Sequence, residues 1–138
     1  MNNVKFFNNH ENTPLTPLSI GELVDKITIL EIKEKNIKDT NKLVNVQTEL
    51  KTLRIILNKL NVKNKISAEI LKLKNINLKL WDIEDDIREQ ERKSNFGDRF
   101  IKLARSVYFT NDERAGIKKV INLKTNSGLI EEKSYQSY

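Results

Sequence analysis

The stretch LVNVQTELKTLRIILNKL, residues 43–60, decides the fold of this chain. Its apolar residues recur at alternating spacings of three and four, which is the seam of a helix that packs lengthwise on another helix. The seam residues are Leu43, Val46, Leu50, Leu53, Leu57 and Leu60. We therefore predict a helix over about residues 42–60, packed against its neighbour as in a coiled-coil hairpin.

Similar spacings on either side of this stretch predict three more helices, over about residues 20–37, 66–93 and 96–123. Ser19 and Glu22 have capping-box spacing at the first of them. Thr110 to Glu113 also fits a capping box, but we favour one continuous helix there. Because only polar turns separate the helices, consecutive helices should run antiparallel. The expected fold class is all-α: an up-down bundle of about four long helices.

The predicted organisation is an extended arm over residues 1–18, a helical domain over 19–123 and a tail over 124–138 that packs on the domain. The first helix has apolar residues on two faces. Its main stripe contains Ile20, Leu23, Val24, Ile27 and Leu30, and Ile29 and Ile32 lie on another face. Such a helix needs two neighbours or a partner chain, so a homodimer is one expectation.

Composition narrows the class of protein. The net charge is +6, but Lys outnumbers Arg by 19 to 6, and Arg makes the specific contacts to bases, so we disfavour nucleic-acid binding. A nucleic-acid-binding surface would consist of the six lysines around the turn after residue 60. These are Lys59, Lys63, Lys65, Lys72, Lys74 and Lys79. The chain has no cysteine, one histidine and no long apolar run. We therefore predict a cytoplasmic protein with no cofactor and no membrane span.

Several polar residues occupy positions on or beside the apolar stripes, and these are the candidate site. They are Glu31, Asn77, Trp81, Glu84, Arg88, Asn111, Arg114 and Lys118. One interpretation is a set of internal ion pairs that fix the register of the helices. The other is a pocket for a small anion, with the Arg and Lys side chains as donors and a Glu as the orienting carboxylate.

Four acidic residues follow Trp81 with helical spacing. They are Asp82, Asp85, Asp86 and Glu89. They form either a solvated acidic face or, less favoured, a carboxylate site for a hard cation. The chain contains no P-loop, no glycine-rich dinucleotide motif and no metalloprotease or serine-hydrolase motif, so we assign no catalytic residue.

Four motifs carry a resemblance to a known family. They are GELVDKITILEIK (21–33), LWDIEDDIR (80–88), LARSVYFTND (103–112) and EEKSY (131–135). The chain resembles, over about residues 15–138, a family of short bacterial and phage proteins known as a domain of unknown function. The resemblance implies that the tail belongs to the domain. It also implies an occurrence near glycosyltransferases and tetratricopeptide proteins, but no activity and no site residues.

Two functions remain open from the sequence. The first is a non-enzymatic helical interaction or accessory module that binds a protein partner or a second copy of itself. The alternative is an all-α enzyme or binder of a small anionic ligand, such as a phosphate, a carboxylate or a sugar nucleotide.

Overall fold

A computed structural model describes residues 12–138, and in this range it contains four α-helices and no strand. The helices are α1 (Ile20–Asn36), α2 (Thr40–Leu60), α3 (Ser67–Arg92) and α4 (Asp98–Lys124), with a 3₁₀ turn, η1 (Lys63–Lys65), before α3. The prediction of an all-α chain with four long helices is confirmed. Most of the predicted N-terminal arm, including His10, lies outside the described residues.

The first two helices begin at side-chain caps, and the first cap is at Ser19, as the capping-box spacing predicts. Ser19 Oγ accepts a hydrogen bond from the Glu22 N–H at 3.1 Å, and Asp39 Oδ1 accepts one from the Lys42 N–H at 2.9 Å. Each cap satisfies one of the backbone donors that a helix leaves unpaired in its first turn. Serine and asparagine are common N-caps, so Ser94 or Asn95 is expected to cap α4. Instead its N-cap is Gly97, and no side chain caps it.

The last three helices end on residues in the left-handed conformation. Asn61, Ser94 and Asn126 have φ angles of 53°, 52° and 51°. Asparagine tolerates this conformation better than most residues, because its short side chain can bond the local backbone. After α3 and after α4, paired backbone hydrogen bonds close the last turn in the Schellman pattern. Ser94 and Asn95 therefore end α3 instead of starting α4.

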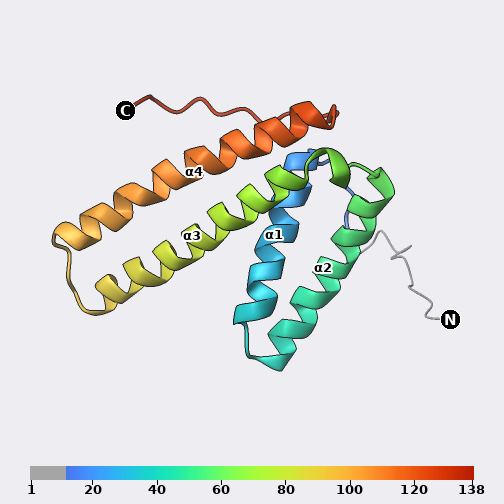
Figure 1. The fold of residues 1–138 in the computed structure, drawn as a ribbon. Helices are drawn as coiled ribbons and strands as arrows, with labels where there is room; N and C mark the ends of the chain where they lie inside the picture. Colours follow the sequence, from blue (N-terminus) through green and yellow to red (C-terminus); the bar gives the residue numbers. More distant parts are fainter. Residues whose placement is uncertain (1–11) are drawn as a thin grey trace.

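The four helices form two antiparallel hairpins, α1–α2 and α3–α4, which cross at an angle (Figure 1). α1 contacts α2, α3 and α4, so it is the central helix of the fold. The longer α3–α4 hairpin continues past α1 and α2 and ends in its own turn (Figure 1). We call residues 81–109, the outer part of this hairpin, the arm. It is distinct from the N-terminal segment predicted over residues 1–18.

The core is aliphatic and lies around α1. Its buried members are Leu23, Val24, Ile27, Leu30, Val46, Leu50, Leu57, Val62, Ile66, Leu73 and Ile121. Each fully buried Leu or Ile contributes about 1.5–3 kcal/mol to stability. The seam of α2 supplies three of these residues, whereas Leu60 at its end is 43% exposed. The spacing in residues 43–60 therefore identified the face that packs.

The second apolar face of α1 is covered within the chain at Ile32, whereas Ile29 is half-buried. Ile32 is only 2% exposed, and α3 and α4 both contact α1. The two-sided pattern of this helix thus has an internal explanation. A homodimer would have to use another surface.

α1 begins in close contact with α4 at Gly21. A Cβ atom at this position would lie 2.6 Å from the Lys118 carbonyl oxygen and 2.9 Å from Asn122 Oδ1. The Gly21 N–H donates a buried hydrogen bond to that same Asn122 oxygen at 2.7 Å. Only glycine permits this approach of the two backbones.

After α4, the tail runs back along the outside of that helix in an extended form (Figure 1). Its end is fixed by Tyr138, whose hydroxyl donates to Asp112 Oδ2 at 2.6 Å. This hydrogen bond raises the pKa of Tyr138 to about 12. No helix within residues 12–138 is long and apolar enough to cross a bilayer.

Candidate functional site

A buried polar network joins α1 to α3 and lies beside the aliphatic core. Asn77 Nδ2 donates to Asp25 Oδ1 at 2.8 Å and to Thr28 Oγ1 at 2.9 Å, and all three residues are buried. Both partners of Asn77 belong to the motif GELVDKITILEIK. Buried polar groups with their partners in place fix the register of two helices. Asn77 therefore has a structural role that its position on the seam edge did not reveal.

Lys118 of α4 extends the same network. Its Nζ lies 2.6 Å from Glu22 Oε2, 4.0 Å from Asp25 Oδ2 and 2.7 Å from Glu131 Oε2 of the tail. Burial alone lowers the pKa of Lys118, but the hydrogen bonds from its ammonium to Glu131 and Glu22 outweigh burial, so its pKa lies above the ordinary value. The lysine is a charged junction between α1, α4 and the tail.

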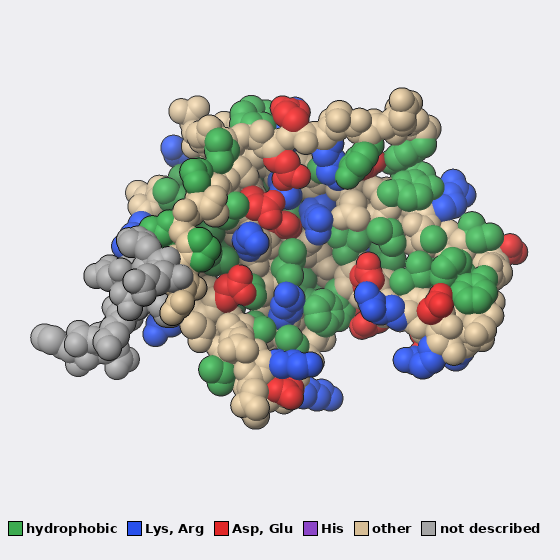
Figure 2. Space-filling model, turned by 180° about the vertical axis from the view of Figure 1, so that it is seen from behind, with side chains coloured by type: hydrophobic (Ala, Val, Ile, Leu, Met, Phe, Trp, Pro, Cys, Tyr) green, Lys and Arg blue, Asp and Glu red, His purple; other side chains and the backbone are tan. Residues whose placement is uncertain are grey.

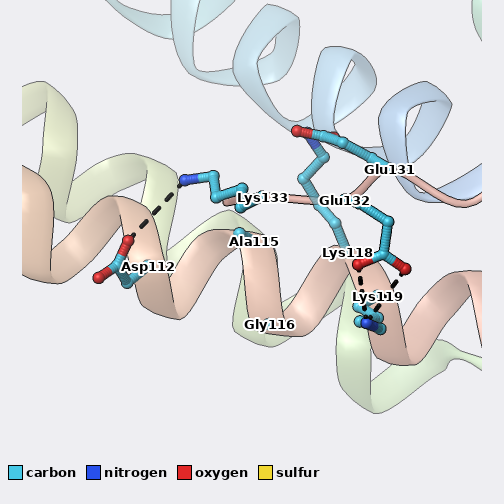
Figure 3. A pocket seen from close by; sticks show the side chains of 8 residues that line it. All are labelled: Asp112, Ala115, Gly116, Lys118, Lys119, Glu131, Glu132 and Lys133. Atoms are coloured by element: carbon cyan, nitrogen blue, oxygen red, sulfur yellow. Dashed lines mark hydrogen bonds and ion pairs between the residues drawn. The ribbon is translucent and has the colours of Figure 1, made fainter. Parts of the chain in front are cut away.

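A recess with a volume of about 280 Å³ lies beside this junction, between the tail and α4. Figure 3 shows Lys133 pointing to Asp112 and Lys119 pointing to Glu132. The charges that line the recess therefore neutralise one another. Such an arrangement attaches the tail and leaves no unpaired charge for a ligand.

Glu31 lies elsewhere and bridges three helices. Its carboxylate accepts hydrogen bonds from Arg54 of α2 at 3.0 Å and from Lys74 of α3 at 2.5 Å. Partial burial raises the pKa of Glu31, but the two hydrogen bonds outweigh burial and hold its pKa below the ordinary value. Here the structure has the internal ion pairs of the first interpretation.

The other candidate residues line one open groove, in the angle where the second half of α1 diverges from the α3–α4 hairpin. Its volume is about 570 Å³. The lining residues are Ile29 and Lys33 of α1, Asn77, Leu80, Trp81, Glu84, Asp85 and Arg88 of α3, and Asn111 and Arg114 of α4. Six of the eight predicted site residues thus meet in this groove, whereas Glu31 and Lys118 do not.

Within the groove, Glu84 and Arg88 form an exposed ion pair one helical turn apart, at 3.4 Å. Sequence reasoning missed Lys33, which lies four residues after Ile29 on α1 and so projects from the same face. It also placed Asp85 with the solvated acids. The spacing of Lys33 from Ile29 was the available signal.

The acidic face does not form a metal site, because the described part of the chain has no group of three or more acidic or histidine side chains that could hold a metal ion. Asp86 pairs with Arg99 at 3.5 Å, and Glu89 pairs with both Arg92 and Lys93. Among the six lysines of the predicted nucleic-acid surface, Lys74 forms an ion pair with Glu31.

Comparison with known proteins places the chain by sequence. A model of a family of unknown function (DUF6165) matches residues 16–138, which include the tail. No curated protein and no solved structure matches the chain. The match confirms the resemblance to a family of unknown function over nearly the whole chain.

Proposed function

The chain belongs to the DUF6165 family of unknown function, and we propose that it is a non-enzymatic interaction module that pairs with a second copy of itself through its arm. The observation that carries this proposal is the position of the aromatic side chains. The proposal includes an accessory role beside larger protein partners, in the cytoplasm of a bacterium or a phage-infected cell.

None of the seven aromatic side chains within residues 12–138 is buried. They are Trp81, Phe96, Phe100, Tyr108, Phe109, Tyr135 and Tyr138. The core uses aliphatic residues alone, although aromatic residues contribute most to cores when they are available. Aromatic residues kept at a surface are typical of the energetic centres of protein interfaces.

These aromatic residues gather in one region. Five belong to the arm, and Tyr138 of the tail packs on it, with its ring centre 4.7 Å from Phe109 and 5.4 Å from Tyr108. Arg105 lies over the other side of this cluster, 5.9 Å from the Phe109 ring centre. Figure 2 shows hydrophobic side chains gathered over the end of the molecule formed by the arm.

The charges of the arm favour a second copy as the occupant. On its α3 side Asp82 and Asp85 have no ion-pair partner among residues 12–138, and on its α4 side the same holds for Lys102 and Arg105. In a twofold dimer, the acidic side of one arm can meet the basic, aromatic side of the other twice. One surface is then complementary to itself.

Light scattering over a range of protein concentrations tests the proposal, with a dimer expected at high concentration. Charge reversal on one side, as K102E/R105E or D82K/D85K, should weaken the dimer, because like charges would then face each other. An equimolar mixture of the two reversed variants should form a mixed dimer, since each supplies the charge that the other lost. This restoration separates a lost interface from a misfolded chain.

A matched pair of apolar variants provides the control. Ile101→Ser changes an arm residue that is 52% exposed, and Val44→Ser changes an α2 residue that is 60% exposed. Only the first should weaken association. A monomer at every concentration, or equal loss in both variants, would overturn the proposal.

A further inference from the structure

The groove between α1 and the α3–α4 hairpin contains more cationic than anionic groups. Lys33, Arg88 and Arg114 face Glu84 and Asp85 there. Glu84 already neutralises Arg88, at 3.4 Å. Three cations against two acids leave one positive charge, and Asp85 is the only remaining acid in the lining.

Two of the cations have no direct ion-pair partner. Within residues 12–138, the side chains of Arg114 and Lys33 make no hydrogen bond and no ion pair, and Arg114 acts on Glu131 of the tail only at longer range. Arg114 is only half-buried, and it lies on α4 one turn before the fully engaged Lys118. A guanidinium presents parallel N–H donors that match the oxygens of a phosphate or carboxylate. The contrast with Lys118, which has three carboxylate neighbours, separates a structural lysine from an arginine that no carboxylate contacts directly.

The other walls of the groove are apolar or neutral. Leu80 and the half-buried Trp81 come from α3, Ile29 from α1, and the Asn111 side chain makes no hydrogen bond within the described residues. A groove of about 570 Å³ falls within the range that small ligands occupy. An indole beside free cations suits a ligand with an anionic end and a planar body.

We propose that this groove binds a small oxyanion ligand, whose phosphate or carboxylate is held by Arg114 and Lys33 and whose planar portion packs on Trp81. The Asn111 side chain can add a hydrogen bond to either portion. This inference goes beyond pairing through the arm and does not rest on it, because all the residues that line the groove come from one chain. Trp81 and Asp85 belong to both surfaces.

Trp81 is the only tryptophan of the chain, so its fluorescence reports on the groove. Four probes separate the contributions: uridine monophosphate and benzoate carry an anion on a ring, inorganic phosphate has no ring, and uridine has no anion. We expect a saturable change in emission with uridine monophosphate or with benzoate, and none with uridine. The stronger of the two shows whether phosphate or carboxylate is preferred.

Variants then assign the contacts. Arg114→Gln should weaken binding of the preferred probe at least tenfold, the loss expected for a charge-assisted hydrogen bond. Arg99→Gln, an exposed residue of the same helix outside the groove, should leave the affinity unchanged. No saturable change with any probe, or equal affinity in Arg114→Gln and the parent chain, would overturn the proposal. Ile101→Ser should still bind, so failure of the dimer and failure of the groove are distinguishable.

Discussion

Replacing Gly21 with alanine should destabilise the protein, although alanine is the better helix former. The added Cβ atom would lie 2.6 Å from the Lys118 carbonyl oxygen and 3.1 Å from the Lys118 carbonyl carbon. These are backbone atoms of a continuous helix, so they cannot rotate away as a side chain would. The start of α1 must therefore move away from α4.

The size of the effect follows from three contributions. Overpacking at a close contact costs about 1–3 kcal/mol. Movement of α1 also weakens the buried hydrogen bond between the Gly21 N–H and Asn122, a loss of about 1 kcal/mol. The helix propensity of alanine returns up to about 1 kcal/mol. We expect a net loss of about 1–3 kcal/mol in the free energy of unfolding.

Gly116→Ala in α4 is the matched control, because no heavy atom lies within 4 Å of a Cβ atom added there. It should stabilise the protein by about 0.5–1 kcal/mol, through helix propensity alone. Urea unfolding followed by circular dichroism measures both variants against the parent chain. If Gly21→Ala were as stable as the parent, or gained as much as Gly116→Ala, the close approach of α1 and α4 would be refuted.

Three further outcomes are expected. Glu131→Gln should leave global stability nearly unchanged, by less than about 1 kcal/mol, because Lys118 keeps its α1 partner, but should speed hydrogen exchange in the tail. The Lys118 ammonium holds the pKa of Glu131 below its ordinary value. The stability that this ion pair adds is therefore complete above the ordinary pKa, and it is lost as the pH falls through the lowered pKa of the folded protein. Acid should therefore release the tail, and NMR of the Glu131 carboxyl measures this. Asn77→Ala should cost about 1–3 kcal/mol in urea unfolding, because it leaves Asp25 and Thr28 buried without their donor; a smaller loss than in an exposed Asn75→Ala control would contradict the network.

The helices were predictable because local chemistry defines them. Capping by Ser19 and Asp39 and the seam of α2 depend on neighbours a few residues away in sequence. The end of α3 was also placed correctly, but the role of Ser94 was not, because a left-handed residue that ends a helix resembles a cap that starts one.

The candidate site was only partly predictable, because its membership depends on how the two hairpins cross. Glu31 projects from the stripe of α1, yet the crossing brings it to Arg54 and Lys74 and away from the groove. Lys118 was placed on the correct face of α4, but its partners lie about 90 residues earlier and in the tail. Helical periodicity gives the direction of a side chain and cannot give the helix that it meets.

The central position of α1 has a consequence for the order of events during synthesis. The ribosome makes α1 first among the helices, while most of the segments that pack around it are made later. The Gly21 N–H in its first turn gains its partner only when Asn122, 101 residues later, has emerged. Until then the face of α1 that packs on α4 is uncovered, and the long loop that must close favours a late final step. A growing chain of this protein therefore exposes apolar helix surface to chaperones until α4 has been made.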